Sequence, residues 1–212
     1  MLEPRIQQHF FESADLLYQV AENLSRPLAD AAQVAVACLT SGGKLLAGGT
    51  GGAQMLAQLM CSVLMTRMER ERPALAAVAL SGHHSLAPYP AEGLGSVEHE
   101  LGLAQQVMAL GQPGDLLVLF SLASHDPAAE AAIREAHAKD MSVVLFGAGL
   151  SAPWHALLAE TDVWIAVPHE RAVRAMELQL LALHALCDAL LGAIASLLSA
   201  RVADSQIADR HD

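Results

Sequence analysis

The stretch LAGGTGGAQMLAQLM, residues 46–60, places a glycine cluster between an apolar run and an apolar helical pattern. This order predicts a short strand at 44–47, a glycine-rich turn, and a helix that ends near residue 66. Such a turn offers backbone N–H groups to an anion at the start of the helix. The helix itself contains no acidic, basic or histidine side chain. The stretch therefore raises the question of whether the chain is an enzyme or only the frame of one.

The same alternation of strand and helix continues along the chain. Apolar runs predict further strands at 74–80, 116–120, 142–147 and 162–168, and helical patterns cover 5–24, 27–39, 96–110, 127–138 and 170–200. Short apolar strands that alternate with helices predict an α/β fold, a doubly wound parallel five-stranded sheet flanked by helices in a flavodoxin-like three-layer sandwich. We expect a single domain over 1–212, made of N-terminal helices at 1–41, a core at 44–168, a long helix at 170–200 and a frayed tail at 201–212.

Composition excludes several classes of partner. The net charge of -11 disfavours direct contact with nucleic acid, because phosphate contacts need clustered basic residues. The longest apolar stretch, 178–198, is interrupted by Gln179, His184 and Asp188, so it predicts a buried helix and no membrane span. The N-terminus has charges and an amphipathic pattern where a signal peptide would have an apolar core, so we expect a cytoplasmic protein.

The long last helix also predicts self-association. Its leucines occur on every side of the helix, and a helix that is apolar all round must be covered all round. One face of a sheet cannot provide that cover, whereas neighbouring subunits can. We therefore expect a homo-oligomer.

Several motifs occur in a fixed order, and together they resemble the sugar isomerase (SIS) domain family. They are GGTGGA at 48–53, Arg67 with ERP at 71–73, GDLLVLFSLASHD at 114–126, IAVP at 165–168 and RAMELQLLALH at 174–184. Within the family the chain is similar to the phosphoheptose isomerases and to their non-isomerase relative, the DnaA initiator-associating protein DiaA. The resemblance implies the SIS fold and a tetramer with ligand sites at subunit borders.

The resemblance also shows where the chain departs from the isomerases. Those enzymes bind zinc and move a proton between adjacent carbons of sedoheptulose 7-phosphate. Their zinc ligands correspond here to Leu59, Val63, Met176 and His184, and only the last of these side chains can ligate zinc. Val63 also replaces a carboxylate that would transfer a proton. We therefore expect no zinc cofactor and no metal site.

The phosphate-binding loop of the family is altered as well. It reads SLASHD at 121–126, where the family has STSGNS. The candidate ligand-binding residues, taken from this loop and the glycine turn, are Thr50, Gly51, Gly52, Ala53, Ser121, Ser124 and Asp126. A carboxylate at Asp126 would repel a phosphate, or it would cap the helix that begins at Pro127. Both interpretations are open at this point.

Two residues of the last helix are candidate catalytic groups. Glu177 and His184 are seven residues apart and so lie on one helical face. They would carry out proton transfer in an active isomerase, or they are a polar pair left beside an old cleft. A second set of histidines, His83, His84, His125 and His169, would form a cluster near the site or lie scattered on the surface.

Three functions are consistent with these residues. The loss of the zinc and acid–base set favours a non-catalytic regulator that resembles DiaA, whose tetramer binds several copies of the initiator DnaA. The alternatives are a sedoheptulose 7-phosphate isomerase with a displaced site, and a sensor that binds a sugar phosphate without reaction.

Overall fold

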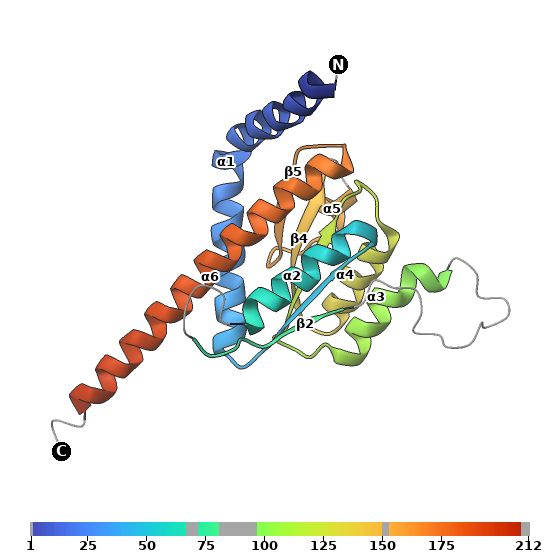
Figure 1. The fold of residues 1–212 in the computed structure, drawn as a ribbon. Coiled ribbons are helices and arrows are strands. Elements are labelled where there is room, and N and C mark those ends of the chain that lie inside the picture. The colour runs from blue at the N-terminus through green and yellow to red at the C-terminus, as the bar shows by residue number, and fades with distance from the viewer. Residues whose placement is uncertain (1, 67–71, 81–96, 150–152, 209–212) are drawn as a thin grey trace.

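The computed structural model describes residues 2–66, 72–80, 97–149 and 153–208, and Figure 1 shows its ribbon. Five strands form one sheet in the order β2-β1-β3-β4-β5, and every neighbouring pair is parallel. This is the flavodoxin-like order, so the predicted fold is confirmed. The strands are β1 (Leu45–Gly49), β2 (Ala77–Ala79), β3 (Leu116–Ser121), β4 (Ser142–Ala148) and β5 (Val163–Val167).

Helices cover both faces of the sheet. The helical segments are α1 (Leu2–Thr40), the short 3-10 turn η1 (Gly51–Ala53), α2 (Gln54–Met65), α3 (Val97–Leu110), α4 (Pro127–Ala138), α5 (Pro153–Leu157) and α6 (Ala172–Ala208). Buried residues of α1, α2 and α6 form one apolar cluster with one face of the sheet. Residues of α3 and α4, with Trp154 of α5, form a second cluster on the other face. The molecule is therefore a three-layer sandwich.

The side chains of the central strand β3 pack alternately into the helix layers on the two faces of the sheet. All its residues are buried, because it has a strand on each side and helices on both faces. Leu117 and Leu119 join the α3–α4 cluster, whereas Phe120 joins the other cluster and stacks on Phe146 at a centroid distance of 4.6 Å. Continuous apolar runs suit strands buried in this way.

The N-terminal segment differs from the prediction. We expected two helices separated near Pro27, but the structure has one helix from Leu2 to Thr40, with Pro27 inside it. Proline removes only one N–H donor from the ladder, and buried residues on both sides of it, Leu24 and Ala31, hold the helix to the core. The helix changes direction along its length (Figure 1).

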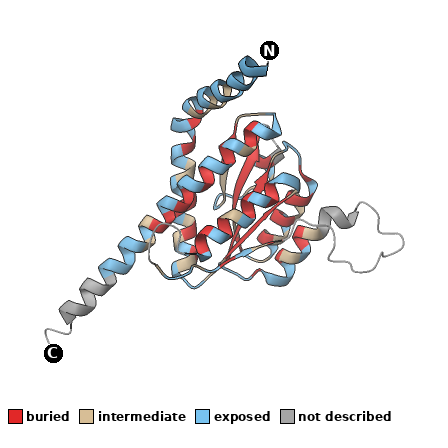
Figure 2. Ribbon diagram, viewed as in Figure 1, coloured by how far each residue is buried: buried red, intermediate tan, exposed pale blue. Residues whose placement is uncertain are grey.

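The C-terminal helix α6 is longer than predicted. It continues to Ala208, past the expected end at residue 200, so the predicted tail is helical up to that point. Figure 2 shows buried residues on the side of its first half that faces the core, while residues 192–200 project from the body and are mostly exposed. The segment Ala172–Ala200 is long and apolar enough to cross a membrane. That is weak evidence for a span, because the core helix of an α/β fold meets the same criterion.

Candidate functional site

The glycine turn after β1 has the tight geometry that its sequence predicts. A Cβ on Gly49 would lie 2.8 Å from the carbonyl group of Ala53, and Gly51 has a φ of +53°. Only glycine fits the first position without a clash, and the second favours it strongly. Inside the turn, the Ala53 N–H donates to the carbonyl of Thr50 at 3.0 Å. This donor, predicted to serve an anion, is therefore used by the turn itself.

The carboxylate of Asp126 lies among the predicted ligand hydroxyls. Thr50 Oγ1 donates to Asp126 Oδ2 at 2.7 Å. Ser121 Oγ lies 3.1 Å from the same oxygen and 3.1 Å from the Ala123 carbonyl oxygen, so its one proton is shared between these two acceptors. The Ala129 N–H donates to Oδ1 at 3.2 Å, so Asp126 is also the N-cap of α4. The structure confirms the capping interpretation. We call Thr50, Ser121 and Asp126 the Asp126 cluster.

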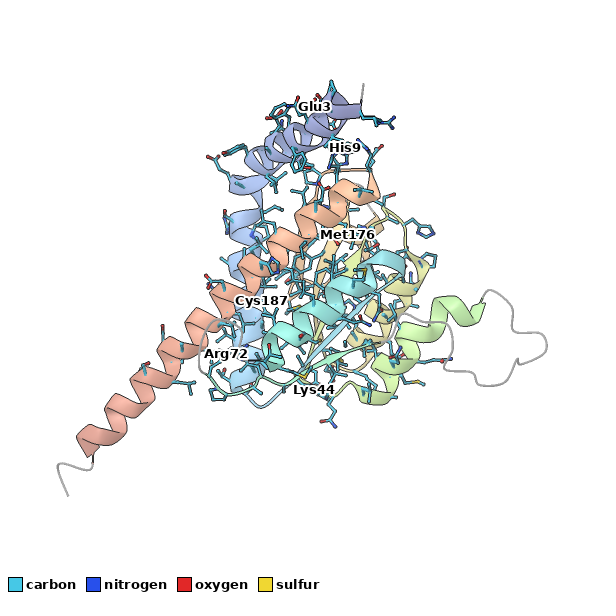
Figure 3. All side chains as sticks on the ribbon, in the orientation of Figure 1. Glu3, His9, Lys44, Arg72, Met176 and Cys187 are labelled. Atoms are coloured by element: carbon cyan, nitrogen blue, oxygen red, sulfur yellow. The ribbon has the colours of Figure 1, made fainter. Side chains whose placement is uncertain are left out.

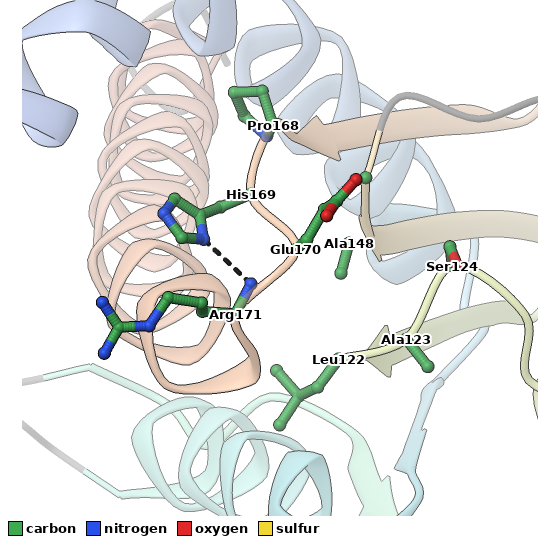
Figure 4. A pocket seen from close by; sticks show the side chains of 9 residues that line it. Leu122, Ala123, Ser124, Ala148, Pro168, His169, Glu170 and Arg171 are labelled. Atoms are coloured by element: carbon green, nitrogen blue, oxygen red, sulfur yellow. Dashed lines mark hydrogen bonds between the residues drawn. The ribbon is translucent and has the colours of Figure 1, made fainter.

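A pocket of about 850 Å³ opens beside this cluster, at the carboxyl ends of β3, β4 and β5 (Figure 4). Ligands of open parallel sheets bind at this edge. We call it the carboxyl-edge pocket, and it is lined by Leu122, Ala123, Ser124, Ala148, Gly149, Pro168, His169, Glu170 and Arg171. Of the predicted ligand-binding residues, Ser124 lines the pocket, while Thr50, Gly51, Gly52, Ala53, Ser121 and Asp126 are not among its lining residues.

The polar lining of the pocket is mixed in charge. Glu170 extends toward Ala148, whereas the guanidinium of Arg171 points away from Ser124 (Figure 4). Arg171 forms an ion pair with Glu12 of α1 at 3.4 Å. His169 Nδ1 accepts a hydrogen bond from the Arg171 backbone N–H at 3.0 Å, which fixes its ring at the rim. The pocket thus offers a carboxylate, a hydroxyl and an imidazole.

Three of the four positions that correspond to zinc ligands are occupied by packing residues, and the fourth, His184, is exposed. Val63 is buried in the core, and Leu59 and Met176 pack against the same cluster. Met176 is labelled in Figure 3, and a Cβ on Gly52 would lie 3.9 Å from its sulfur. Within the described ranges, no three His, Cys, Asp or Glu side chains are grouped to hold a metal ion. These residues do not fit a zinc ion, since His184 alone among the four has a ligating side chain.

The candidate catalytic residues are not brought together. Seven residues along an α-helix correspond to a rise of about 10 Å, so Glu177 and His184 share a face without hydrogen-bond contact. Neither residue lines the carboxyl-edge pocket. The Glu177 carboxylate accepts hydrogen bonds from Ser13 Oγ at 2.7 Å and from Arg174 Nη1 at 2.8 Å. Burial raises the pKa of Glu177, but these hydrogen bonds outweigh it and leave the pKa lowered.

Sequence reasoning missed Arg174, which anchors α1 to the start of α6. Its side chain is 3% exposed and donates to His9 Nδ1 at 2.8 Å, to Glu12 at 3.1 Å and to Ser13 at 2.7 Å, as well as to Glu177. A hydrogen bond to Arg174 is the main cause of the lowered pKa of Glu12. The signal was available, because a buried arginine in an apolar helical pattern requires acidic partners.

Gln179 was also missed. It was treated as an interruption of the apolar stretch, but its Nε2 donates to the carbonyls of Ser121 at 2.8 Å and Phe146 at 3.2 Å. These carbonyls lie near the carboxyl ends of β3 and β4. Gln179 therefore ties α6 to the strand ends beside the pocket. An amide within a buried helix face is a signal for such a connection, since buried polar groups require partners.

The predicted histidine cluster is not supported by the described residues. His125 contacts Glu130 at 2.9 Å and is 69% exposed, while His169 belongs to the pocket rim. His83 and His84 lie outside the described residues, as do Arg67 and Glu71 of the motif formed by Arg67 and ERP.

Comparison with known proteins identifies the family. The SIS domain family model matches residues 8–148, which is more than half of the chain. This chain belongs to the SIS domain family. The match covers the sheet from β1 to β4 and the Asp126 cluster, and it includes the β3 loop and the end of β4 on one side of the pocket.

Phosphoheptose isomerases are prominent among the relatives of this SIS domain. The enzyme of that name from Methylibium petroleiphilum is 46% identical over 190 residues, 89% of this chain and 93% of the relative. That from Azoarcus sp. is 38% identical over 87% of this chain and 92% of the relative. The phosphoheptose isomerase structure from Neisseria gonorrhoeae has a TM-score of 0.78 at 33% identity, covering 91% of this chain and 100% of its own.

These relatives correct the main functional prediction. We expected a non-catalytic regulator that resembles DiaA and binds DnaA. The strong matches are instead named phosphoheptose isomerase. They favour the alternative reading, a sedoheptulose 7-phosphate isomerase or a sugar-phosphate sensor, over the regulator. The prediction was wrong because it weighed only the positions of Leu59, Val63 and Met176, whereas similarity along the whole chain carries more information.

Proposed function

We propose that this chain binds a phosphorylated heptose in the carboxyl-edge pocket. The proposal rests on the identity of the relatives together with the place of the pocket. Relatives up to 46% identical along most of the chain are named phosphoheptose isomerase, and a pocket lies at the strand edge where such folds bind ligands. Its volume is within the range of small-molecule sites.

The lining is suited to a polyhydroxylated ligand. The carboxylate of Glu170 accepts hydrogen bonds from sugar hydroxyls, and the Ser124 hydroxyl both donates and accepts. Leu122, Ala123 and Ala148 supply apolar surface for the carbon face of a sugar. We further propose that binding occurs without a zinc ion at positions 59, 63, 176 and 184, because their side chains do not fit one.

Isomerisation of sedoheptulose 7-phosphate is the second candidate function, and the names of the relatives favour it. The reaction moves a proton between adjacent carbons, so it needs a titratable group within reach of both. Glu177 and His184 are the candidate groups on α6. The lowered pKa of Glu177 makes it a weak base, so a ligand would have to displace Arg174 or Ser13 for it to act.

We propose that the working unit is a cytoplasmic homotetramer. The first half of α1 and the face of α6 expose large apolar side chains, among them Phe10 at 72%, Phe11 at 61% and Leu181 at 52%. Contiguous exposed apolar surface marks interaction sites. A stable monomer in light scattering at micromolar concentration would contradict this assembly.

Calorimetric titration with sedoheptulose 7-phosphate tests the main proposal. We expect saturable binding that a chelator leaves unchanged, and weaker binding by Glu170→Gln, in which one of the two carboxylate acceptors becomes an NH2 donor and the charge is lost. Glu160→Gln is the matched control, because Glu160 is exposed and is not among the pocket residues. No binding at millimolar ligand would refute the proposal. Turnover of the same compound, abolished by Glu177→Gln, would establish the second candidate.

A further inference from the structure

The Asp126 cluster places a negative charge where two strand ends and a helix start meet. Thr50 follows β1, Ser121 ends β3, and Asp126 caps α4. The two hydroxyls are the donors that the glycine turn and the β3 loop would offer to an anion. Thr50 already donates to Asp126 Oδ2 at 2.7 Å, and the Ser121 hydroxyl is engaged by the same oxygen at 3.1 Å and by the Ala123 carbonyl at 3.1 Å. The carboxylate therefore occupies the position that an anionic ligand group would take.

The surroundings of Asp126 disfavour a second anion at the hydroxyls that it contacts. The donors that the structure gives Asp126 are two hydroxyls and the Ala129 N–H, all of them neutral. Asp126 is 7% exposed, so water screens its charge poorly. A phosphate brought to the same donors would be repelled by the carboxylate of Asp126. It would also compete with that carboxylate for the hydrogen bonds of the two hydroxyls. The neighbouring Leu122 and Ala123 add no hydroxyl that would compensate.

We infer that Asp126 is a specificity-determining residue that keeps the phosphate of the ligand out of the Asp126 cluster. The inference rests on the proposed function, because it assigns which part of a sugar phosphate the site recognises. The pocket then recognises the sugar mainly by its hydroxyls, and the phosphate adds little to affinity. A serine at position 126 would return the cluster to a set of neutral donors.

Three variants separate charge from shape. Asp126→Ser removes the carboxylate and keeps a side chain that caps helices well, and Asp126→Asn removes the charge at nearly constant shape. Glu130→Gln is the matched control, since Glu130 lies in the first turn of α4 and contacts His125 and Arg134 outside the cluster. Circular dichroism establishes whether each variant is folded. If Asp126→Ser does not fold, Asp126→Asn still tests the effect of removing the charge.

The measurement is calorimetric titration of each protein with inorganic phosphate, sedoheptulose 7-phosphate and unphosphorylated sedoheptulose. In the unaltered protein we expect the two sugars to bind with affinities within about tenfold of each other, and inorganic phosphate to bind negligibly. In Asp126→Ser we expect the preference for the phosphorylated sugar to rise by about tenfold or more, with measurable phosphate binding. Asp126→Asn should show a smaller gain, and Glu130→Gln none.

The two proposals fail in different ways. The proposed role of Asp126 would be overturned if the Ser and Asn variants kept the same preference for the phosphorylated sugar. It would also be overturned if the unaltered protein bound inorganic phosphate as well as Asp126→Ser does. In either case the proposal of sugar binding would stand. If the unaltered protein binds neither sugar, the proposed function fails. Inorganic phosphate then still decides the role of Asp126, because binding by Asp126→Ser alone supports it and no binding by that variant contradicts it.

Discussion

Two buried aspartates connect the same pair of strands at opposite ends of the sheet. Asp115, just before β3, accepts hydrogen bonds from the backbone N–H groups of Lys44 and Gln112 at 2.9 Å each, and it pairs with the Lys44 ammonium. Asp126, just after β3, accepts from Thr50, Ser121 and the Ala129 N–H. They are 4% and 7% exposed. The first carboxylate has a cation beside it, whereas the donors that the described residues give the second are all neutral.

The difference separates a structural contact from a site. At the amino edge, the ion pair of Asp115 and Lys44 connects β1 to β3, and the two charges neutralise each other. At the carboxyl edge, the bare charge stands beside the pocket and affects what can bind there. The same residue type thus stabilises the fold at one end and selects ligands at the other.

The largest expected effect is on Asp115. Asp115→Ala removes the partner of Lys44 and leaves two backbone N–H groups without an acceptor, so the free energy of unfolding should fall by about 3 kcal/mol. Urea denaturation measures this loss. Asp30→Asn, an exposed change on α1, should leave stability unaltered. A loss no greater than in that control would show that the amino-edge pair does not hold the strands.

A smaller loss in the free energy of unfolding is expected for Asp126, at the carboxyl edge of the sheet. Asp126→Ala removes the N-cap of α4, which should cost about 1–2 kcal/mol, while Asp126→Ser should cost less because serine also caps. The same denaturation experiment compares the two. If Asp126→Ala lowered the free energy of unfolding as much as Asp115→Ala, the carboxyl-edge aspartate would be mainly structural, and the two aspartates would not differ in role.

The Arg174 contacts predict a pH dependence that neither aspartate causes. The pKa values of Glu12 and Glu177 are lowered, so their contribution to stability is present above their ordinary pKa of 4.5 and is lost as pH falls through the lowered values. Arg174→Met should reduce stability at pH 7 and flatten its fall below pH 4.5. The effect is modest, since both carboxylates are about 40% exposed.

Urea midpoints measured across that pH range test the Arg174 prediction. Arg134→Met is the control, because Arg134 forms an exposed pair with Glu130 on the opposite layer. Parallel curves for the unaltered protein and Arg174→Met would contradict the assignment of these shifts to Arg174.

The smallest effect is expected from metal removal. Because Leu59, Val63 and Met176 cannot ligate zinc, a chelator should shift the melting temperature by less than about 1 °C, and added zinc should not raise it. Differential scanning fluorimetry measures both. A drop of several degrees with chelator would reveal a metal site that these positions do not supply.

Much of the fold was predictable because its signals are local. The predicted bounds of α4 match the observed Pro127–Ala138, since Asp126 and Pro127 mark its start. Strands buried on both faces read as unbroken apolar runs. Pro27 misled the prediction because tertiary packing kept α1 continuous, and that packing depends on residues far away in the sequence.

The candidate site was less predictable because its contacts are long-range. Ser124 and the cap at Asp126 were identified from the loop sequence, but the bond from Thr50 to Asp126 spans 76 residues. The links from Arg174 to α1 span more than 160. No helical or strand periodicity encodes such pairs. His169 was a candidate from the sequence, whereas Glu170, which also follows the last strand, was recognised only when the sheet order placed that edge beside the β3 loop.

A crystal structure of the unaltered protein with sedoheptulose 7-phosphate tests the central claim most directly. We predict that the sugar lies in the carboxyl-edge pocket between Ser124, Ala148 and Glu170, and that Thr50 and Ser121 still donate to Asp126. A phosphate group bound to the hydroxyls of Thr50 and Ser121, with Asp126 displaced, would contradict the claim, as would a pocket that stays empty at saturating ligand.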